Sequence, residues 1–176
     1  HSALVGQADA WLEKRFIAAR EHALKDELPD IYFGLWLYRL EQSDIEDICR
    51  LLTGTAETMR VCKQIQHVKT RLSDLKESSK PSRVVCVLDG LGHITLEVIA
   101  LAEDKHVRSQ IQCYHDKYRH VQPTIGGADL RARGLVPGPI IGHILSRVRN
   151  AWLDGEITDT ITEENLVREL VAAEEE

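Results

Sequence analysis

The stretch AETMRVCKQIQHVKTRLSDLKE, residues 56–77, repeats apolar side chains at intervals of three and four positions. The residues on this stripe are Met59, Cys62, Ile65, Val68, Leu72 and Leu75. Because an α-helix turns once in about 3.6 residues, these side chains share one face of a helix. The spacing therefore predicts a long amphipathic helix over residues 56–77.

Helical spacing governs the rest of the chain as well, with proline and glycine as start and stop signals. The predicted helices cover about residues 12–23, 31–40, 44–52 behind a capping box at Ser43, 82–89, 94–102, 107–121, 129–133, 139–153, and 162–173 with Thr162 as N-cap. No segment alternates like a strand between hairpin turns. We therefore expect an all-α fold, a multi-helical array of about eight to ten helices.

A polar break, Glu77-Ser-Ser-Lys-Pro81, is the best candidate boundary in the chain. It divides the sequence into helical parts at residues 1–80 and 81–176. One continuous domain is the alternative, since 176 residues fall within the size of a single domain.

Charge is unevenly distributed along a chain whose net charge is −6. Between Lys105 and Leu153 eight Lys and Arg face only Asp116 and Asp129, a local charge of +6. From Asp154 onward nine acids face only Arg168. Because the local pattern decides what a polyanion meets, the basic stretch remains compatible with nucleic-acid binding.

The four cysteines, Cys49, Cys62, Cys86 and Cys113, stand apart from one another without a C-x-x-C pair. Each falls in a helical apolar pattern, where a thiol behaves as a small hydrophobic group. We expect reduced, buried thiols in a cytoplasmic protein. No run approaches the roughly 20 apolar residues of a membrane helix, so no membrane partner is expected.

The segment GLVPGPIIGHIL, residues 134–145, has the features of an exposed helix start. Pro139 suits the first helical position, and Gly138 before it lets another backbone come close. The N–H groups of Ile140 and Ile141 would then point from the positive end of the helix dipole, a place that favours phosphate. The alternative is a tight corner between helices that binds nothing.

Three pieces of the sequence resemble the C-terminal signature of bacterial class II tRNA nucleotidyltransferases and poly(A) polymerases. They are Gly127-Ala-Asp129-Leu130, then Gly134-Leu-x-Pro-Gly-Pro-x-x-Gly142-x-Ile-Leu145, then Ala151-x-Leu-Asp-Gly155-Glu-Ile157. A looser likeness covers about 100 preceding residues, including Lys80-Pro-Ser82. The resemblance implies the helical fold of the poly(A) polymerase C-terminal region.

That resemblance also implies a division of labour. Helical neck, body and tail regions would hold tRNA or another RNA 3′ end while an N-terminal head adds nucleotides with Mg²⁺ and ATP or CTP. The head's Gly-Gly loop and strand-borne carboxylate pair have no match here, so we expect no catalytic residue, metal or cofactor in this chain. CCA addition, A addition and poly(A) synthesis all stay open.

Basic side chains suitable for phosphate contacts form two rows and a cluster. Arg60, Lys63, His67 and Arg71 follow one face of the helix over 56–77, and Arg108, Gln112, His115 and Arg119 follow another helix. The predicted RNA-binding residues are Arg60, Lys63, Arg71, Arg108, Arg119, Arg131, Arg133, Gly138, Pro139, Ile140, Ile141, His143, Arg147 and Arg149. The alternative for each row is an ordinary solvated helix face.

Two other functions compete with RNA binding. The helix pairs could form a protein–protein or homodimer interface without RNA contact. His115-Asp116 could belong to an HD-type phosphohydrolase, but that enzyme class needs a further His and Asp at the same metal, and Asp129 has no supporting pattern. The aromatic residues Tyr114, Tyr118, Trp152 and Trp36 fall in apolar helices, which favours core packing over base stacking.

Overall fold

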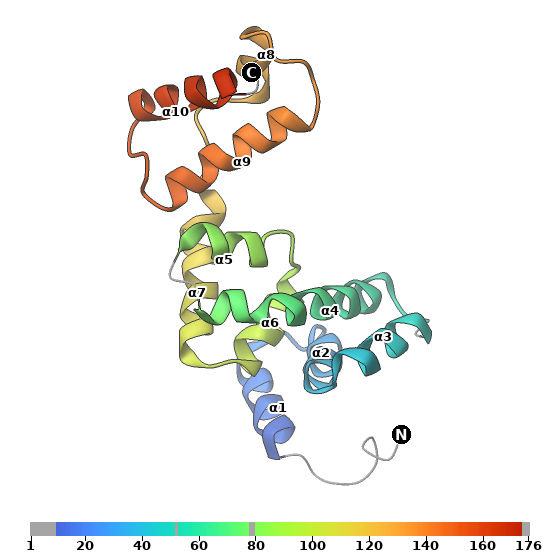
Figure 1. Ribbon diagram of the computed structural model, residues 1–176. Helices are drawn as coiled ribbons and strands as arrows, with labels where there is room; N and C mark the ends of the chain where they lie inside the picture. The colour runs from blue at the N-terminus through green and yellow to red at the C-terminus, as the bar shows by residue number, and fades with distance from the viewer. Residues whose placement is uncertain (1–9, 52, 78–79, 174–176) are drawn as a thin grey trace. The chain divides into compact units, whose positions relative to one another are not determined.

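The structure is a computed structural model that describes residues 10–51, 53–77 and 80–173. These residues form ten α-helices and one short 3-10 helix, and none of them lies in a strand (Figure 1). The all-α prediction is confirmed. Among the described helices no single one is long and apolar enough to cross a membrane; α5 and α6 reach that length and hydropathy only as a pair bent by 119°.

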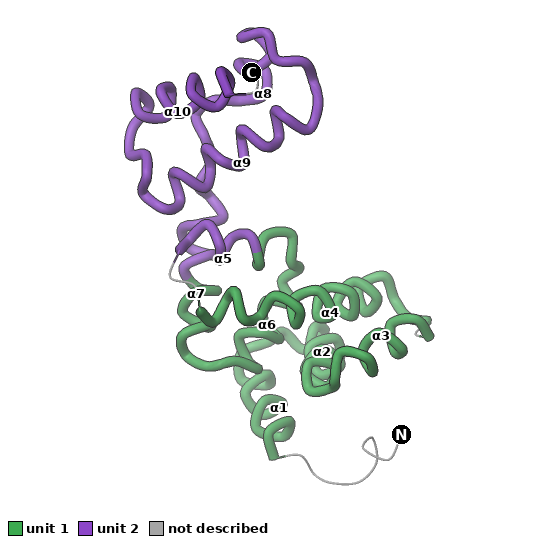
Figure 2. Tube along the Cα trace, in the orientation of Figure 1, with its two compact units in different colours: residues 1–77, 87–112 green, residues 78–86, 113–176 purple. Residues whose placement is uncertain are grey.

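The chain forms two compact units that interleave in sequence (Figure 2). Unit 1 contains residues 1–77 and 87–112, and unit 2 contains residues 78–86 and 113–176. The chain leaves unit 1 after Glu77, returns within α5 (Pro81–Leu88) and leaves again within α7 (Lys105–Asp116). The division at residue 80 into two successive parts stays a prediction.

Unit 1 is organised around α2 (Leu28–Arg39), which packs against both α4 and α6. Its other helices are α1 (Ala10–His22), α3 (Gln42–Leu51), α4 (Ala56–Glu77) and α6 (His93–Ala102). Ile31, Leu35 and Leu37 of α2 are completely buried. A Cβ on Gly34 would stand 2.6 Å from Val98 Cγ2, so the missing side chain lets α2 and α6 approach closely.

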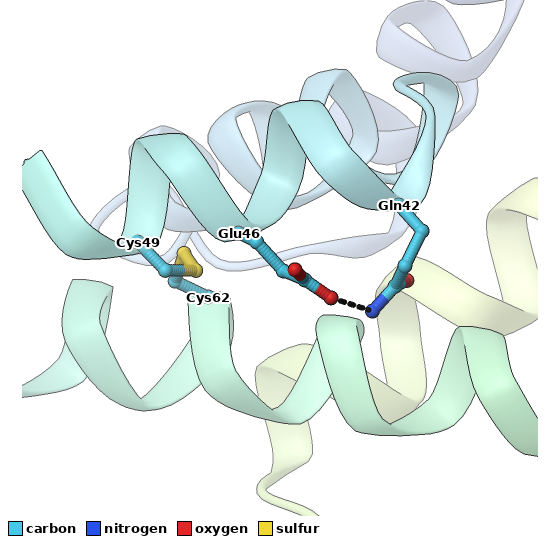
Figure 3. Close-up of a disulfide and its surroundings, with 4 residues drawn as sticks. All are labelled: Gln42, Glu46, Cys49 and Cys62. Carbon is cyan, nitrogen blue, oxygen red and sulfur yellow. Dashed lines mark hydrogen bonds between the residues drawn. A yellow bond between two sulfur atoms is a disulfide. The ribbon is translucent and has the colours of Figure 1, made fainter.

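A disulfide joins Cys49 of α3 to Cys62 of α4 (Figure 3). On the same side of α3, the Gln42 amide donates to Glu46 at 3.3 Å. The expectation of four reduced, buried thiols is therefore wrong: two cysteines are bonded, Cys86 is exposed and only Cys113 is a partly buried thiol. Residues 49 and 62 lie on different helices, and sequence spacing does not show that those helices pair.

Unit 2 is built from α8 (Gly127–Ala132), α9 (Pro139–Leu153) and α10 (Thr160–Ala173), with the 3-10 helix Tyr118–His120 before them. The buried residues of its core are Leu130, Ile144, Val148, Ala151, Ile157 and Val167. A charged group lies beside this core: Glu163 is only 2% exposed. Its carboxylate accepts the Ile125 N–H at 2.9 Å and the Trp152 Nε1–H at 3.0 Å, so it links three segments of unit 2.

Several predicted helix ends differ from the structure by a few residues, and three of these differences have a local cause. Ser43 does not cap α3; the helix begins one residue earlier, at Gln42, and Ser43 lies in its first turn. The predicted helix over 107–121 ends at Asp116, where Lys117 leaves helical geometry and a 3-10 turn follows, and this turn keeps Tyr118 partly buried as the apolar spacing requires. Asp159, not Thr162, caps α10, because its carboxylate accepts the N–H groups of residues 161 and 162.

Candidate nucleic-acid interface

The predicted helix entrance in unit 2 is exposed. Pro139 occupies the first turn of α9, and the extended backbone of Gly138 precedes it. Val136 is 78% exposed and Ile140 42%. Ile141 turns inward against the unit 2 core, so only its backbone could meet a ligand. Since the first N–H groups of a helix lack intrahelical acceptors, this entrance can accept an anion.

The glycines of this region fall into two kinds. Gly134 (φ +97°) and Gly155 (φ +71°) terminate α8 and α9 in left-handed backbone, a conformation that glycine adopts most easily. The accompanying bonds, such as Leu135 N–H to Leu130 O at 3.3 Å and Glu156 N–H to Ala151 O at 2.9 Å, complete the usual helix ending. The fold itself therefore requires these two glycines.

Gly138 and Gly142 have no such requirement. Gly138 has φ 173°, which any residue adopts, and an added Cβ would meet only Val136 O at 3.9 Å. An added Cβ on Gly142 would meet nothing within 4 Å, although glycine in a helix is less stable than alanine by about 1 kcal/mol. Both residues are exposed. Packing and backbone geometry within the described residues therefore do not explain why glycine occupies positions 138 and 142 at the start of α9.

The two aspartates of the quoted motifs have structural roles. Asp129 accepts the Gly126 N–H at 2.8 Å at the start of its own helix, α8. Asp154 accepts the Ser82 N–H at 2.9 Å and the Ser82 hydroxyl at 2.7 Å, at the start of α5. The Lys80-Pro-Ser82 piece and the Asp-Gly-Glu-Ile piece therefore meet within unit 2.

Several predicted cations of unit 2 already have partners. Arg133 forms a two-pronged ion pair with Glu164 at 2.6 and 2.7 Å, which lowers the pKa of Glu164. Arg147 pairs with Glu156 at 2.6 Å. Arg131 and Arg149 donate from Nε to the carbonyls of Gly127 and Val121, respectively. The acidic C-terminal segment thus offsets two arginines of the predicted cluster.

The remaining predicted cations of unit 2 are exposed. Arg119 lies 3.4 Å from both ring nitrogens of His115. His143 is on the exposed face of α9, one residue beyond Gly142. Within unit 2 the structure therefore gathers Gly138, Pro139, Ile140 and His143 at one exposed helix start, while the arginines are spread over α8, α9 and the 3-10 helix.

The predicted cations of unit 1 form a separate set. Arg60 pairs with Glu57 at 2.6 Å and lies against Gly92, and Arg71 is 3.9 Å from Asp74. Lys63 and His67 are exposed on the same helix, α4. Arg108 donates from Nε to Ala100 O at 3.1 Å. The α4 row is therefore a real exposed stripe, but acids offset two of its members.

The alternative chemistries find little support in the described part of the chain. Among these residues no group of three or more His, Cys, Asp or Glu side chains is arranged to hold a metal. His115, half of the HD dipeptide, lies beside Arg119. Of the aromatic candidates, Tyr114 is buried, and Trp152 is partly buried with its N–H committed to Glu163.

Sequence reasoning missed two features. Glu163 looks like one more acid of the C-terminal segment, and no local pattern marks it as buried. Lys14 and Arg15 join Lys105 and Arg108 at a pocket of unit 1. About 90 residues separate these two pairs along the chain, so only the packing of α1 beside α6 reveals their proximity.

The fold has a counterpart among solved structures. No protein-family model matches the sequence, and no curated protein matches it. The Thermotoga maritima CCA-adding enzyme, solved in complex with tRNA, is similar in structure with a TM-score of 0.69 at 16% sequence identity. The similarity covers 97% of this chain and 43% of that chain. The chain therefore has the helical fold found in part of a tRNA nucleotidyltransferase, and it spans less than half the length of that enzyme.

Proposed function

We propose that this chain is an RNA-binding helical module that holds a tRNA, or a similar RNA, while a separate catalytic head adds nucleotides to the RNA 3′ end. The structural similarity to the CCA-adding enzyme, which was solved with tRNA, covers 97% of this chain and therefore both units. The quoted motifs, which resemble the C-terminal signature of the same enzymes, supply independent support from sequence. The module contributes positioning rather than chemistry.

The observation that carries the proposal is the pair of exposed glycines, Gly138 and Gly142, at the start of α9. Both occupy positions where an alanine side chain would fit, and at Gly142, inside the helix, alanine would stabilise α9. The absence of side chains at Gly138 and Gly142, close to helix N–H groups that lack intrahelical acceptors, suits the close approach of a sugar–phosphate backbone. RNA contact at this turn gives the two glycines a function that the fold alone does not.

The nearby arginines can take part despite their partners. The side chains of the Arg133–Glu164 and Arg147–Glu156 pairs are about one third to two fifths exposed. Exposed ion pairs contribute only about 0–1 kcal/mol, so a phosphate can replace either carboxylate at small cost. Arg131, exposed on α8, adds a further cation in the same unit.

The test measures RNA affinity and protein stability on the same variant. Gly142→Ala should stabilise the protein by about 1 kcal/mol, because alanine favours the helix. It should weaken binding of labelled tRNA by about tenfold, equivalent to about 1.4 kcal/mol, because the added methyl group blocks close approach. Asn150→Ala, an exposed change near the other end of α9, is the matched control and should leave tRNA affinity unchanged.

Salt dependence provides a second measurement. Affinity of the unaltered protein for tRNA should fall steeply between about 50 and 200 mM salt, as expected for contacts that release counterions from phosphates. Affinity that does not change with salt contradicts the proposal. Equal tRNA affinity of Gly142→Ala and the unaltered protein removes the α9 entrance from the interface.

A protein-binding module is the second candidate, and the exposed apolar side chains of Val136 and Ile140 favour it. If they form a homodimer interface, light scattering will give twice the monomer mass. Val136→Ser/Ile140→Ser should then restore the monomer. A protein that is monomeric at micromolar concentration and binds tRNA excludes this candidate.

A further inference from the structure

A pocket of about 420 Å³ lies in unit 1 beside α1 and the turn between α6 and α7. Four cations line it: Lys14 and Arg15 from α1, and Lys105 and Arg108 from the first turn of α7. The other charged residues at the pocket are Glu103 and Asp104. Four cations and two acids leave a formal charge of +2.

Both acids are committed to other groups. Glu103, whose side chain is only 10% exposed, accepts the Tyr38 hydroxyl at 2.5 Å and pairs with Lys76 at 2.8 Å. Asp104 caps α7 by accepting the N–H groups of His106 and Val107 at 2.9 and 3.0 Å. Lys76 thus offsets the charge of Glu103, and the N–H groups at the start of α7 offset part of the charge of Asp104.

The cations are less constrained. No ion pair links Lys14 or Lys105 to any described residue, and both side chains are exposed. Arg108 uses Nε for the Ala100 carbonyl, which leaves its terminal nitrogens as donors. The Arg15 guanidinium lies 4.7 Å from the Trp11 ring, and its Nε is buried without a hydrogen-bond partner. Like charges gathered around one hollow repel each other unless an anion joins them.

We propose that this pocket binds a phosphate group of an RNA backbone and so provides a second RNA contact. Its phosphate-binding residues are Lys14, Arg15, Lys105 and Arg108. The proposal rests on the RNA-binding function proposed above and adds a site in unit 1 to the α9 entrance of unit 2. Three of the four residues, Lys14, Arg15 and Lys105, are absent from the set predicted from sequence.

The chemistry favours a backbone phosphate over a small free anion. Asp104 already occupies the first N–H groups of α7, so the pocket lacks the fixed backbone donors that enclose a free phosphate. Lysine ammonium groups on flexible stems act as point charges, which suits a backbone phosphate of any sequence. The contact adds affinity and its salt dependence without reading bases.

The experiment compares two double variants that remove the same charge. Lys14→Gln/Lys105→Gln removes the two lysines of the pocket; both are exposed, so folding should be preserved. Lys25→Gln/Arg83→Gln removes two exposed cations that do not line the pocket. A third variant, Lys14→Arg/Lys105→Arg, keeps the charge. Binding of labelled tRNA is titrated for each at several salt concentrations, with circular dichroism as the check on folding.

We expect the pocket variant to bind tRNA at 0.1 M salt about fivefold to tenfold more weakly per lost contact, with the salt slope reduced by about one for each. The control and the arginine variant should bind like the unaltered protein. Equal affinity of the pocket and control variants overturns the pocket and leaves the proposed function standing. If the unaltered protein does not bind tRNA, the proposed function fails first.

Calorimetry with inorganic phosphate tests whether the pocket binds a free phosphate ion instead of an RNA backbone phosphate. Phosphate should not bind measurably at millimolar concentration, because the pocket supplies no fixed donor shell. Phosphate binding that is lost in the pocket variant, together with unchanged tRNA affinity, assigns the pocket to a free anion and overturns the proposal.

Discussion

The two units use their charged residues differently. In unit 2 Arg133 and Arg147 pair with Glu164 and Glu156, and the buried Glu163 holds backbone and indole N–H groups. In unit 1 Lys14 and Lys105 line a pocket without ion-pair partners in the described residues. Acids therefore offset two of the clustered arginines of unit 2, while in unit 1 cations about 90 residues apart converge at one pocket. A count of charge along the chain does not locate the available positive surface.

The largest effect should come from the buried carboxylate of unit 2. Glu163→Ala leaves the Ile125 N–H and the Trp152 indole N–H without this acceptor, at a cost of about 2–4 kcal/mol for two partly buried donors. Glu169→Ala, an exposed change on the same helix, should cost less than about 0.5 kcal/mol. Chemical denaturation measures the loss in the free energy of unfolding, and amide hydrogen exchange shows whether the loss of protection lies in unit 2. Loss of protection in unit 1 alone would contradict the comparison.

The disulfide should stabilise unit 1 by about 2–3 kcal/mol, the value expected when a loop of this length is closed. Adding dithiothreitol should lower the free energy of unfolding of the unaltered protein, measured by chemical denaturation, by that amount. Cys49→Ser should be less stable and should no longer respond to the reductant. If the reductant does not change the free energy of unfolding of the unaltered protein, the bond does not stabilise unit 1. That result would agree with the reduced thiols of a cytoplasmic protein, which the sequence led us to expect.

The arginine pairs should matter little for stability, and less for RNA binding than the two lysines of the unit 1 pocket. Arg133→Gln/Arg147→Gln removes two exposed ion pairs and should change the free energy of unfolding by less than about 1 kcal/mol. Its tRNA affinity should fall less than that of Lys14→Gln/Lys105→Gln, because the carboxylates already offset these arginines. A larger loss for the arginine variant reverses the contrast between the units.

The smallest effect is one that both units share. Asp104 in unit 1 and Asp159 in unit 2 cap helices, and the backbone N–H groups they accept lower the pKa of each carboxyl. A lowered folded-state pKa gives stability that is present above the ordinary aspartate value and is lost as the pH falls through the folded value. Asp104→Asn and Asp159→Asn should each reduce the loss of melting temperature below about pH 4. A variant that retains the full acid sensitivity contradicts this role.

Local signals predicted most of the fold. The bounds of α4 and α9 agree with prediction at Ala56 and Glu77 and at Pro139 and Leu153, because apolar period, proline and glycine all act over a few residues. Ser43 was wrongly predicted as a cap, because α3 begins at Gln42 and Ser43 lies inside its first turn. The fold class needed no more than the helical period.

The site was less accessible from sequence. The α9 entrance was found because Pro139 and Gly138 are adjacent in the chain. The disulfide, the burial of Glu163 and the pocket at Lys14 depend on which helices pack together, and sequence spacing does not encode those pairings. The partners of Arg133 and Arg147 were missed for the same reason, since the acids that offset them lie 31 and 9 residues away.

The bond between Ser82 and Asp154 sets an order for biosynthesis. The two residues are 72 positions apart, and they belong to one unit while residues 87–112 between them belong to the other. At a translation rate of about 5–20 residues per second, Ser82 waits about 4–14 s on the ribosome before its carboxylate partner is made. All of unit 1 has been synthesised by then, so the nascent chain can complete unit 1 first and close unit 2 afterwards.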